Sequence, residues 1–142
     1  MKKITFLGII LISVLFFASC NSSERNYKEV IIDAYEDGFP RKINYYTQDS
    51  ILIKTSEFHP NHMLFIEGRF KDQTRDGHWK SWRDNGVMWS EAHYKNGVQH
   101  GDYRTYHENG QLYIDGHFKN GKHSGTWNFY DEDGQLLKTV KY

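Results

Sequence analysis

The sequence predicts an all-β protein, an elongated antiparallel meander of stacked β-hairpin repeats. Two sets of glycines recur with a period of 24 residues: Gly77, Gly101 and Gly125, and Gly86, Gly110 and Gly134. Aromatic residues make up 16% of the chain, which also holds 12 glycines and only 2 prolines. A fixed period of about 20 to 50 residues indicates a repeat architecture, in which stacked units supply the core.

The first segment of the chain has the pattern of a secretory signal peptide. Lys2 and Lys3 precede an apolar run from Ile4 to Phe17, which small residues close. The run is shorter than the about 20 apolar residues of a comfortable membrane-spanning helix. We therefore predict a signal peptide over residues 1–19, with an uncleaved signal anchor as the alternative. Both place the remaining chain in the bacterial cell envelope, tethered to a membrane, with inner or outer membrane left open.

Cys20 follows the apolar run directly. The sequence Phe17-Ala18-Ser19-Cys20 resembles the lipobox of bacterial lipoproteins. The resemblance implies cleavage before Cys20 and acylation of its thiol and new amino terminus, so that lipid makes the membrane contact. It is the single cysteine of the sequence and cannot form an internal disulfide. Residues 20–26 are predicted to be a lipidated cysteine followed by a flexible polar leash.

The repeats are predicted to occupy residues 58–142, after a degenerate N-terminal repeat region over residues 27–57. Subtracting one period places Phe58 on Trp82 and puts His62 where a turn glycine is expected. One period earlier, Gly38 falls on the turn, although the nearby Pro40 is accommodated only at a sheet edge or a bulge. A degraded terminal unit is usual in repeat stacks.

Each unit is predicted to be a β-hairpin. Asn85-Gly86 and its two repeat equivalents favour two-residue type I′ turns, because both central residues of that turn need positive φ. This register would pair Trp82 with Trp89, Lys80 with Glu91 and Trp79 with Ala92. A second kind of link, with glycine at both ends, would join each hairpin to the next. The predicted turn glycines are Gly86, Gly97, Gly110, Gly121 and Gly134.

These motifs together resemble a known repeat family. Gly-x-Trp-x-x-Trp-x-x-Asn-Gly, followed by Glu91 and by Tyr-Lys-Asn-Gly97, resembles the MORN repeat in the variant of YwqK-type antitoxins. The resemblance covers Gly77 to Tyr142 and extends more weakly over residues 58–70. It implies an elongated hairpin sheet that acts as a scaffold for protein or lipid contacts. The subtype also implies an alternative function, an antitoxin or immunity protein that neutralises a toxin.

Seven aromatic residues are predicted to lie along one face near the hairpin tips. They are Phe58, Phe65, Trp82, Trp89, Tyr106, Tyr113 and Tyr130. Such a ladder would grip a protein strand or a glycan, since Tyr and Trp supply rigid contact area at low entropy cost. The alternative is that the rings pack on one another and form half of the core. We predict a non-catalytic interaction or scaffold module whose partner is an unidentified envelope protein, with a glycan as the alternative.

The eight histidines raise the question of a metal site. The best candidates are His59-x-x-His62 and the pair His93 and His117, which lie one repeat apart. Successive repeats advance by about 10 Å, whereas zinc needs its nitrogen ligands about 2.0 to 2.1 Å away. We therefore predict no metal and no other cofactor.

Catalysis and nucleic-acid binding are also disfavoured. Glu67, Glu91 and Asp115 recur regularly beside Lys80 and Arg104, which favours structural ion pairs over catalytic carboxylates. Nucleophile and phosphate-binding motifs are lacking, so we predict that the protein is not an enzyme. Removing residues 1–19 takes two lysines and no acid from a chain of formal charge +0, leaving about −2. This balance gives no electrostatic reason to bind nucleic acid.

Overall fold

The computed structural model describes residues 26–142 and folds them into β-strands without a helix. The strands are β1 (Lys28–Ala34), β2 (Pro40–Tyr46), β3 (Leu52–Phe58), β4 (Leu64–Lys71), β5 (Thr74–Trp82), β6 (Met88–Lys95), β7 (Val98–Tyr106), β8 (Leu112–Lys119), β9 (Lys122–Tyr130) and β10 (Leu136–Lys141). They form one ten-stranded sheet in sequence order with antiparallel neighbours, so the all-β meander is confirmed. The predicted signal peptide and Cys20 lie outside the described residues. Within those residues, no helix is long and apolar enough to cross a membrane.

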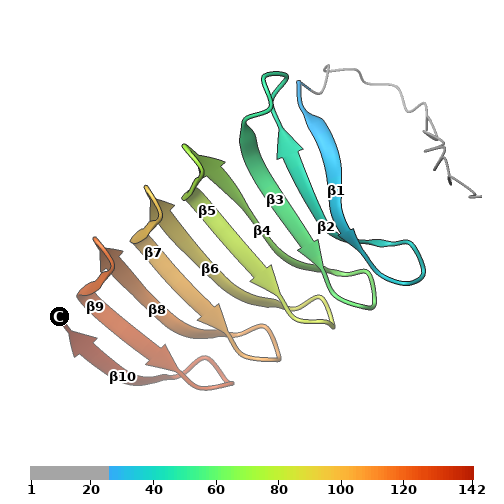
Figure 1. Cartoon of the computed structure of the whole chain (residues 1–142). Coiled ribbons are helices and arrows are strands. Elements are labelled where there is room, and N and C mark those ends of the chain that lie inside the picture. The colour runs from blue at the N-terminus through green and yellow to red at the C-terminus, as the bar shows by residue number, and fades with distance from the viewer. Residues whose placement is uncertain (1–25) are drawn as a thin grey trace, which may run out of the picture.

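The sheet is a single open layer whose first and last strands lie at opposite ends (Figure 1). Its two long sides differ. One, which we call the tip side, carries the loops within the hairpins, such as β5–β6; the other, the link side, carries the connections between hairpins, such as β6–β7 (Figure 1). The predicted stack of hairpins is therefore an extended ribbon with two distinct rims.

The loops of the tip side are three residues long, so the predicted type I′ turns at the tips are wrong. In the β5–β6 loop, the N–H of Gly86 donates to the carbonyl of Arg83 over 3.0 Å, and the N–H of Arg83 donates to the carbonyl of Val87 over 2.8 Å. Gly86 has φ +80°, whereas Asn85 does not have positive φ. This is the pattern of a type I turn followed by a glycine in the left-handed region.

The type I′ turns lie instead on the link side. Asn96 and Gly97 have φ values of 50° and 81° and form the two-residue turn between the partners Lys95 and Val98. The preceding link keeps this geometry without glycine, since Asp72 and Gln73 have φ values of 49° and 62°. Asn and Asp tolerate the left-handed region through local hydrogen bonds, but glutamine there is unusual.

The predicted register holds along each repeat hairpin and fails at its tip. Lys80 and Glu91 are partners as predicted, but Trp82 faces Met88, so the predicted pairing of Trp82 with Trp89 is wrong. Trp89 is the extra residue of a β-bulge, which compensates for the additional residue of the loop. The same shift recurs in the β7–β8 hairpin.

The most buried hydrophobic side chains are large rings packed on glycine. Trp79 and Trp127 are each 4% exposed. Trp79 is a backbone partner of Ala92, as predicted, yet its ring covers Gly68 on the preceding strand, and Trp127 covers Gly116 in the same way. Each indole N–H donates to the carbonyl of the residue after that glycine, over 3.0 and 3.2 Å. The core is therefore a row of ring-on-glycine contacts on one face of a single sheet.

The degenerate N-terminal region (residues 27–57) and the first predicted repeat after it keep the same loop geometry. The N–H groups of Gly38 and His62 close their loops by donating three residues back, and His62 has φ +69° in place of the usual glycine. Pro40 is the first residue of β2 and lies beside a register shift between β1 and β2, in line with the predicted edge or bulge position. His62 also stacks on Phe39 with ring centroids 3.9 Å apart.

Replacing Gly110 with valine should lower the free energy of unfolding by about 1 to 2 kcal/mol. Gly110 has φ +85° in the β7–β8 loop, where a β-branched side chain is strained by its own backbone. Gly110→Asn is the matched control and should cost less, because asparagine tolerates this conformation. Urea unfolding followed by circular dichroism measures both. Equal stability of Gly110→Val and the parent would contradict the loop assignment.

Candidate functional site

A row of side-chain hydrogen bonds ties the hairpin tips together at the repeat period. Each donor reaches a backbone carbonyl in the next hairpin: Tyr35 Oη to Phe58, His59 Nε2 to Trp82, Arg83 Nη2 to Tyr106 and His107 Nε2 to Tyr130, over 2.6, 2.9, 3.1 and 2.9 Å. A carbonyl can only accept, so both imidazoles carry a proton on Nε2. We call these four residues the tip ladder. The tip ladder could not be found from the sequence, because its donors share a position in the repeat but not a residue type.

The seven predicted aromatic residues all lie at the tip side, in two structural classes. Four end strands: Phe58, Trp82, Tyr106 and Tyr130. The other three are Phe65, Trp89 and Tyr113, the extra residues of the bulges in β4, β6 and β8. Trp89 is 47% and Tyr113 41% exposed, whereas the other five are half-buried. The two alternatives, exposed ladder and packed core, therefore hold for different members of the set.

A hollow of about 360 Å³ opens between the tips of the second and third hairpins. It is lined by His59, Phe65, Trp82, Arg83, Asp84, Asn85, Trp89 and Glu108. The guanidinium of Arg83 lies 5.7 Å from the centre of the Trp89 ring, within the range of cation–π attraction. Its Nε–H is buried and has no hydrogen-bond partner among residues 26–142. The hollow thus combines aromatic rings with the guanidinium of Arg83.

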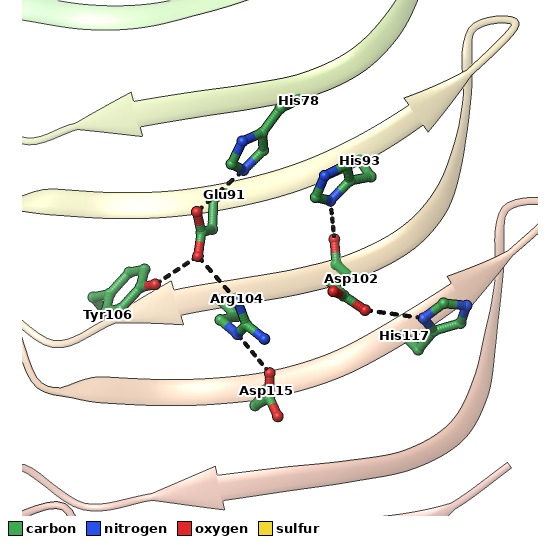
Figure 2. A network of polar contacts seen from close by, with 8 residues as sticks. All are labelled: His78, Glu91, His93, Asp102, Arg104, Tyr106, Asp115 and His117. Atoms are coloured by element: carbon green, nitrogen blue, oxygen red, sulfur yellow. Dashed lines mark hydrogen bonds and ion pairs between the residues drawn. The ribbon is translucent and has the colours of Figure 1, made fainter.

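A polar network occupies one face of the sheet, with Glu91 at its centre (Figure 2). Glu91 accepts a 2.8 Å hydrogen bond from the hydroxyl of Tyr106, and its carboxylate lies 3.5 Å from Arg104 and 3.1 Å from His78. Partial burial opposes ionisation, but the hydrogen bond from Tyr106 and the neighbouring His78 and Arg104 together hold the pKa of Glu91 below its ordinary value. Burial, followed by the bond to Glu91, raises the pKa of Tyr106 to about 12.

The histidines on this face contact acidic residues and one another, and their side chains do not converge on one point. His78 and His93 stack with ring centroids 4.5 Å apart and an interplanar angle of 3°. Burial and then the neighbouring His93 lower the pKa of His78, against the opposite pull of Glu91. His93 and His117 both contact Asp102, over 3.4 Å to its carbonyl and 3.2 Å to its carboxylate (Figure 2).

The remaining candidate metal ligands and carboxylates have separate partners. His59 belongs to the tip ladder, and His62 pairs with Asp37 over 2.7 Å. Glu67 pairs with Lys54 over 2.6 Å, and Arg104 bonds Asp115 over 2.8 Å. Among residues 26–142, no three His, Cys, Asp or Glu side chains are grouped so that they could hold a metal ion.

Comparison with known families gives a result for the C-terminal hairpins. Residues 75–96, 99–120 and 124–142 match the family described as MORN repeat variant. These segments coincide with the β5–β6, β7–β8 and β9–β10 hairpins, whereas β1 to β4 precede the matched MORN segments. No curated protein and no solved structure matches the chain.

Proposed function

We propose that this protein is an envelope lipoprotein whose hairpin sheet is a non-catalytic binding module for another protein. MORN repeats suggest a repeat module for binding. The observation that carries the finer proposal is the hollow at the tips, where Trp89 is exposed beside the guanidinium of Arg83. Exposed aromatic residues beside an arginine are the composition that dominates binding energy at protein interfaces.

An extended segment of a partner protein fits this surface. Its side chains would pack on Trp89 and Tyr113, beside the guanidinium of Arg83. The tip ladder fixes the relative positions of neighbouring loops before binding, because Arg83 also donates to the next hairpin over 3.1 Å. A preformed surface loses less conformational entropy when the partner binds.

The tip surface can be tested by crosslinked capture from the native envelope. The double variant Trp89→Ala with Tyr113→Ala should lose the captured partner while keeping the circular dichroism spectrum of the parent. The matched control is Ile51→Ala with Val98→Ala, because these side chains are also exposed, by 56% and 45%, but lie on the link side. Equal capture by both double variants would contradict the proposal. Loss of capture after glycosidase treatment would identify a glycan instead.

The membrane anchor rests on the sequence of residues 17–20. Cys20→Ser should release the protein from sedimented membranes, because lipid burial contributes about 0.8 kcal/mol per CH₂ and would be lost with the thiol. The parent chain is the control for sedimentation. A variant that still sediments fully with membranes would point to the uncleaved signal anchor.

The antitoxin or immunity alternative depends on the YwqK-type resemblance, which the comparisons do not support beyond the repeat itself. Export also counts against a conventional antitoxin, because a protein outside the cytoplasm cannot neutralise a toxin inside it. A toxin gene beside this one, with rescue that depends on this protein, would favour that alternative.

A further inference from the structure

The two end strands of the sheet each have a neighbour on one side only. Within residues 26–142, the outer edges of β1 and β10 pair with no other strand. Both carry exposed apolar side chains: Ile31 and Ile32 are 58% and 49% exposed on β1, and Leu136 and Leu137 are 57% and 65% exposed on β10. An open edge with exposed apolar residues is a template for pairing with another chain.

The joints between successive hairpins share one register. The joints β2–β3, β4–β5, β6–β7 and β8–β9 pair Lys42 with Glu57, Ile66 with Ser81, Ser90 with Thr105 and Ile114 with Phe129. Both members advance by 24 residues at each step. Advancing once more by 24 residues from Ile114 places the next joint at Lys138 on β10. Its partner would be the residue one period before Glu57, which is Asp33, on β1 of a second chain.

The charges at that joint repeat a contact that the sheet already makes. Lys42 and Glu57 form an ion pair over 2.9 Å at the first joint. Lys138 and Asp33 occupy the equivalent positions with the same signs of charge. Asp33 already bonds Arg41 through Oδ2 alone, so its other carboxylate oxygen faces no competing arginine contact.

The charges also favour pairing of β10 with β1 over pairing of two β10 strands or of two β1 strands. β10 carries Lys138 and Lys141 and no acid, so two β10 strands would bring four lysines together. β1 carries one lysine and two acids, so two β1 strands would bring four acids together. Only the mixed pair joins strands of opposite net charge, and like charges directly opposite each other are destabilising.

We propose that a second copy of this chain docks end to end, with its β1 added to the open edge of β10 in the register of the hairpin joints. Lys138 then faces Asp33. Thr139 faces Ile31, because Ile32 is the extra residue at the register shift between Ile31 and Asp33. Such a contact uses different surfaces on the two copies and leaves one open edge at each end. Assembly therefore continues into linear chains rather than stopping at a dimer.

Cysteine crosslinking of the full-length protein in membranes tests this register. One tagged chain carries Thr139→Cys and a second carries Ile31→Cys, and a mild oxidant is added. We expect a mixed disulfide-linked dimer on non-reducing gels, and a ladder of larger species when both substitutions are on one chain. Val30→Cys replaces Ile31→Cys in the matched control and should lose the adduct, because Val30 and Ile31 are consecutive in the regular part of β1 and point to opposite faces. Each cysteine variant is also oxidised alone, so that any crosslink made through the native Cys20 is measured separately.

Charge reversal gives an independent readout. Adding Lys138→Glu to the Thr139→Cys chain should abolish the adduct, whereas Lys122→Glu, an exposed lysine on β9 away from both edges, should not. A mixed adduct no stronger than those of the single variants would overturn the proposal. So would an adduct of Ile31→Cys with itself that equals the mixed one, since this would indicate pairing of two β1 edges. Neither outcome bears on the tip surface, which takes no part in this contact.

Discussion

Replacing Gly116 with alanine should lower the free energy of unfolding by about 3 kcal/mol, the cost of overpacking a site whose neighbour cannot move freely. A Cβ atom at residue 116 would lie 2.4 Å from Cδ2 of Trp127, far inside contact distance. Trp127 is 4% exposed and its indole N–H is bonded to the carbonyl of His117, so the ring can yield only by breaking that bond and its packing. Urea unfolding followed by far-ultraviolet circular dichroism measures the change.

Gly125→Ala is the matched control for this substitution. Gly125 has φ +69°, and nothing lies within 4 Å of a Cβ atom built there, so alanine costs only the backbone strain of the left-handed region, about 1 kcal/mol. Gly116 does not have positive φ, so its larger cost would come from the collision with the ring. If Gly116→Ala were no more destabilising than Gly125→Ala, the ring-on-glycine core would be refuted.

Strand order and register were accessible from the sequence because identical units must pair with their neighbours identically. Once Gly86 and Gly110 marked the period, the partners of Lys80 and of its equivalents followed, and the structure agrees. Turn type was not accessible. Asn-Gly suits both a type I′ turn and the third position of a three-residue loop, and what decides between them is whether Arg83 pairs with Val87.

The same ambiguity limited the prediction of the candidate site. The tip aromatics were located at the tips, but their exposure depends on the bulge that places Trp89 outside the regular pairing. A two-residue turn at Asn85-Gly86, as predicted, gives a regular register without that bulge. The packing of Trp79 on Gly68 was missed for another reason: pairing within a hairpin favours Ala92 as the small partner, while the ring leans across the joint toward the preceding strand.

Replacing Glu91 with alanine should lower the free energy of unfolding by about 2 kcal/mol at pH 7, the range for losing a buried, charge-assisted hydrogen bond. The Glu91 side chain is 17% exposed and serves Tyr106, Arg104 and His78 together. Without it, the hydroxyl of Tyr106 loses its acceptor, and Arg104 keeps only its bond to Asp115. Thermal and urea unfolding of the variant and the parent give the difference.

Glu67→Ala is the matched control, because Glu67 is the equivalent residue one repeat earlier. It has one ion-pair partner, Lys54, and is 32% exposed, so its loss should cost less than about 1 kcal/mol. The pH dependence separates the two further. Since the folded pKa of Glu91 lies below its ordinary value of 4.5, its contribution is present above pH 4.5 and is lost as the pH falls through the lowered folded value. Glu91→Gln should therefore flatten the acid limb of the stability curve, and an acid limb unchanged in Glu91→Gln would show that the network in Figure 2 does not stabilise the sheet.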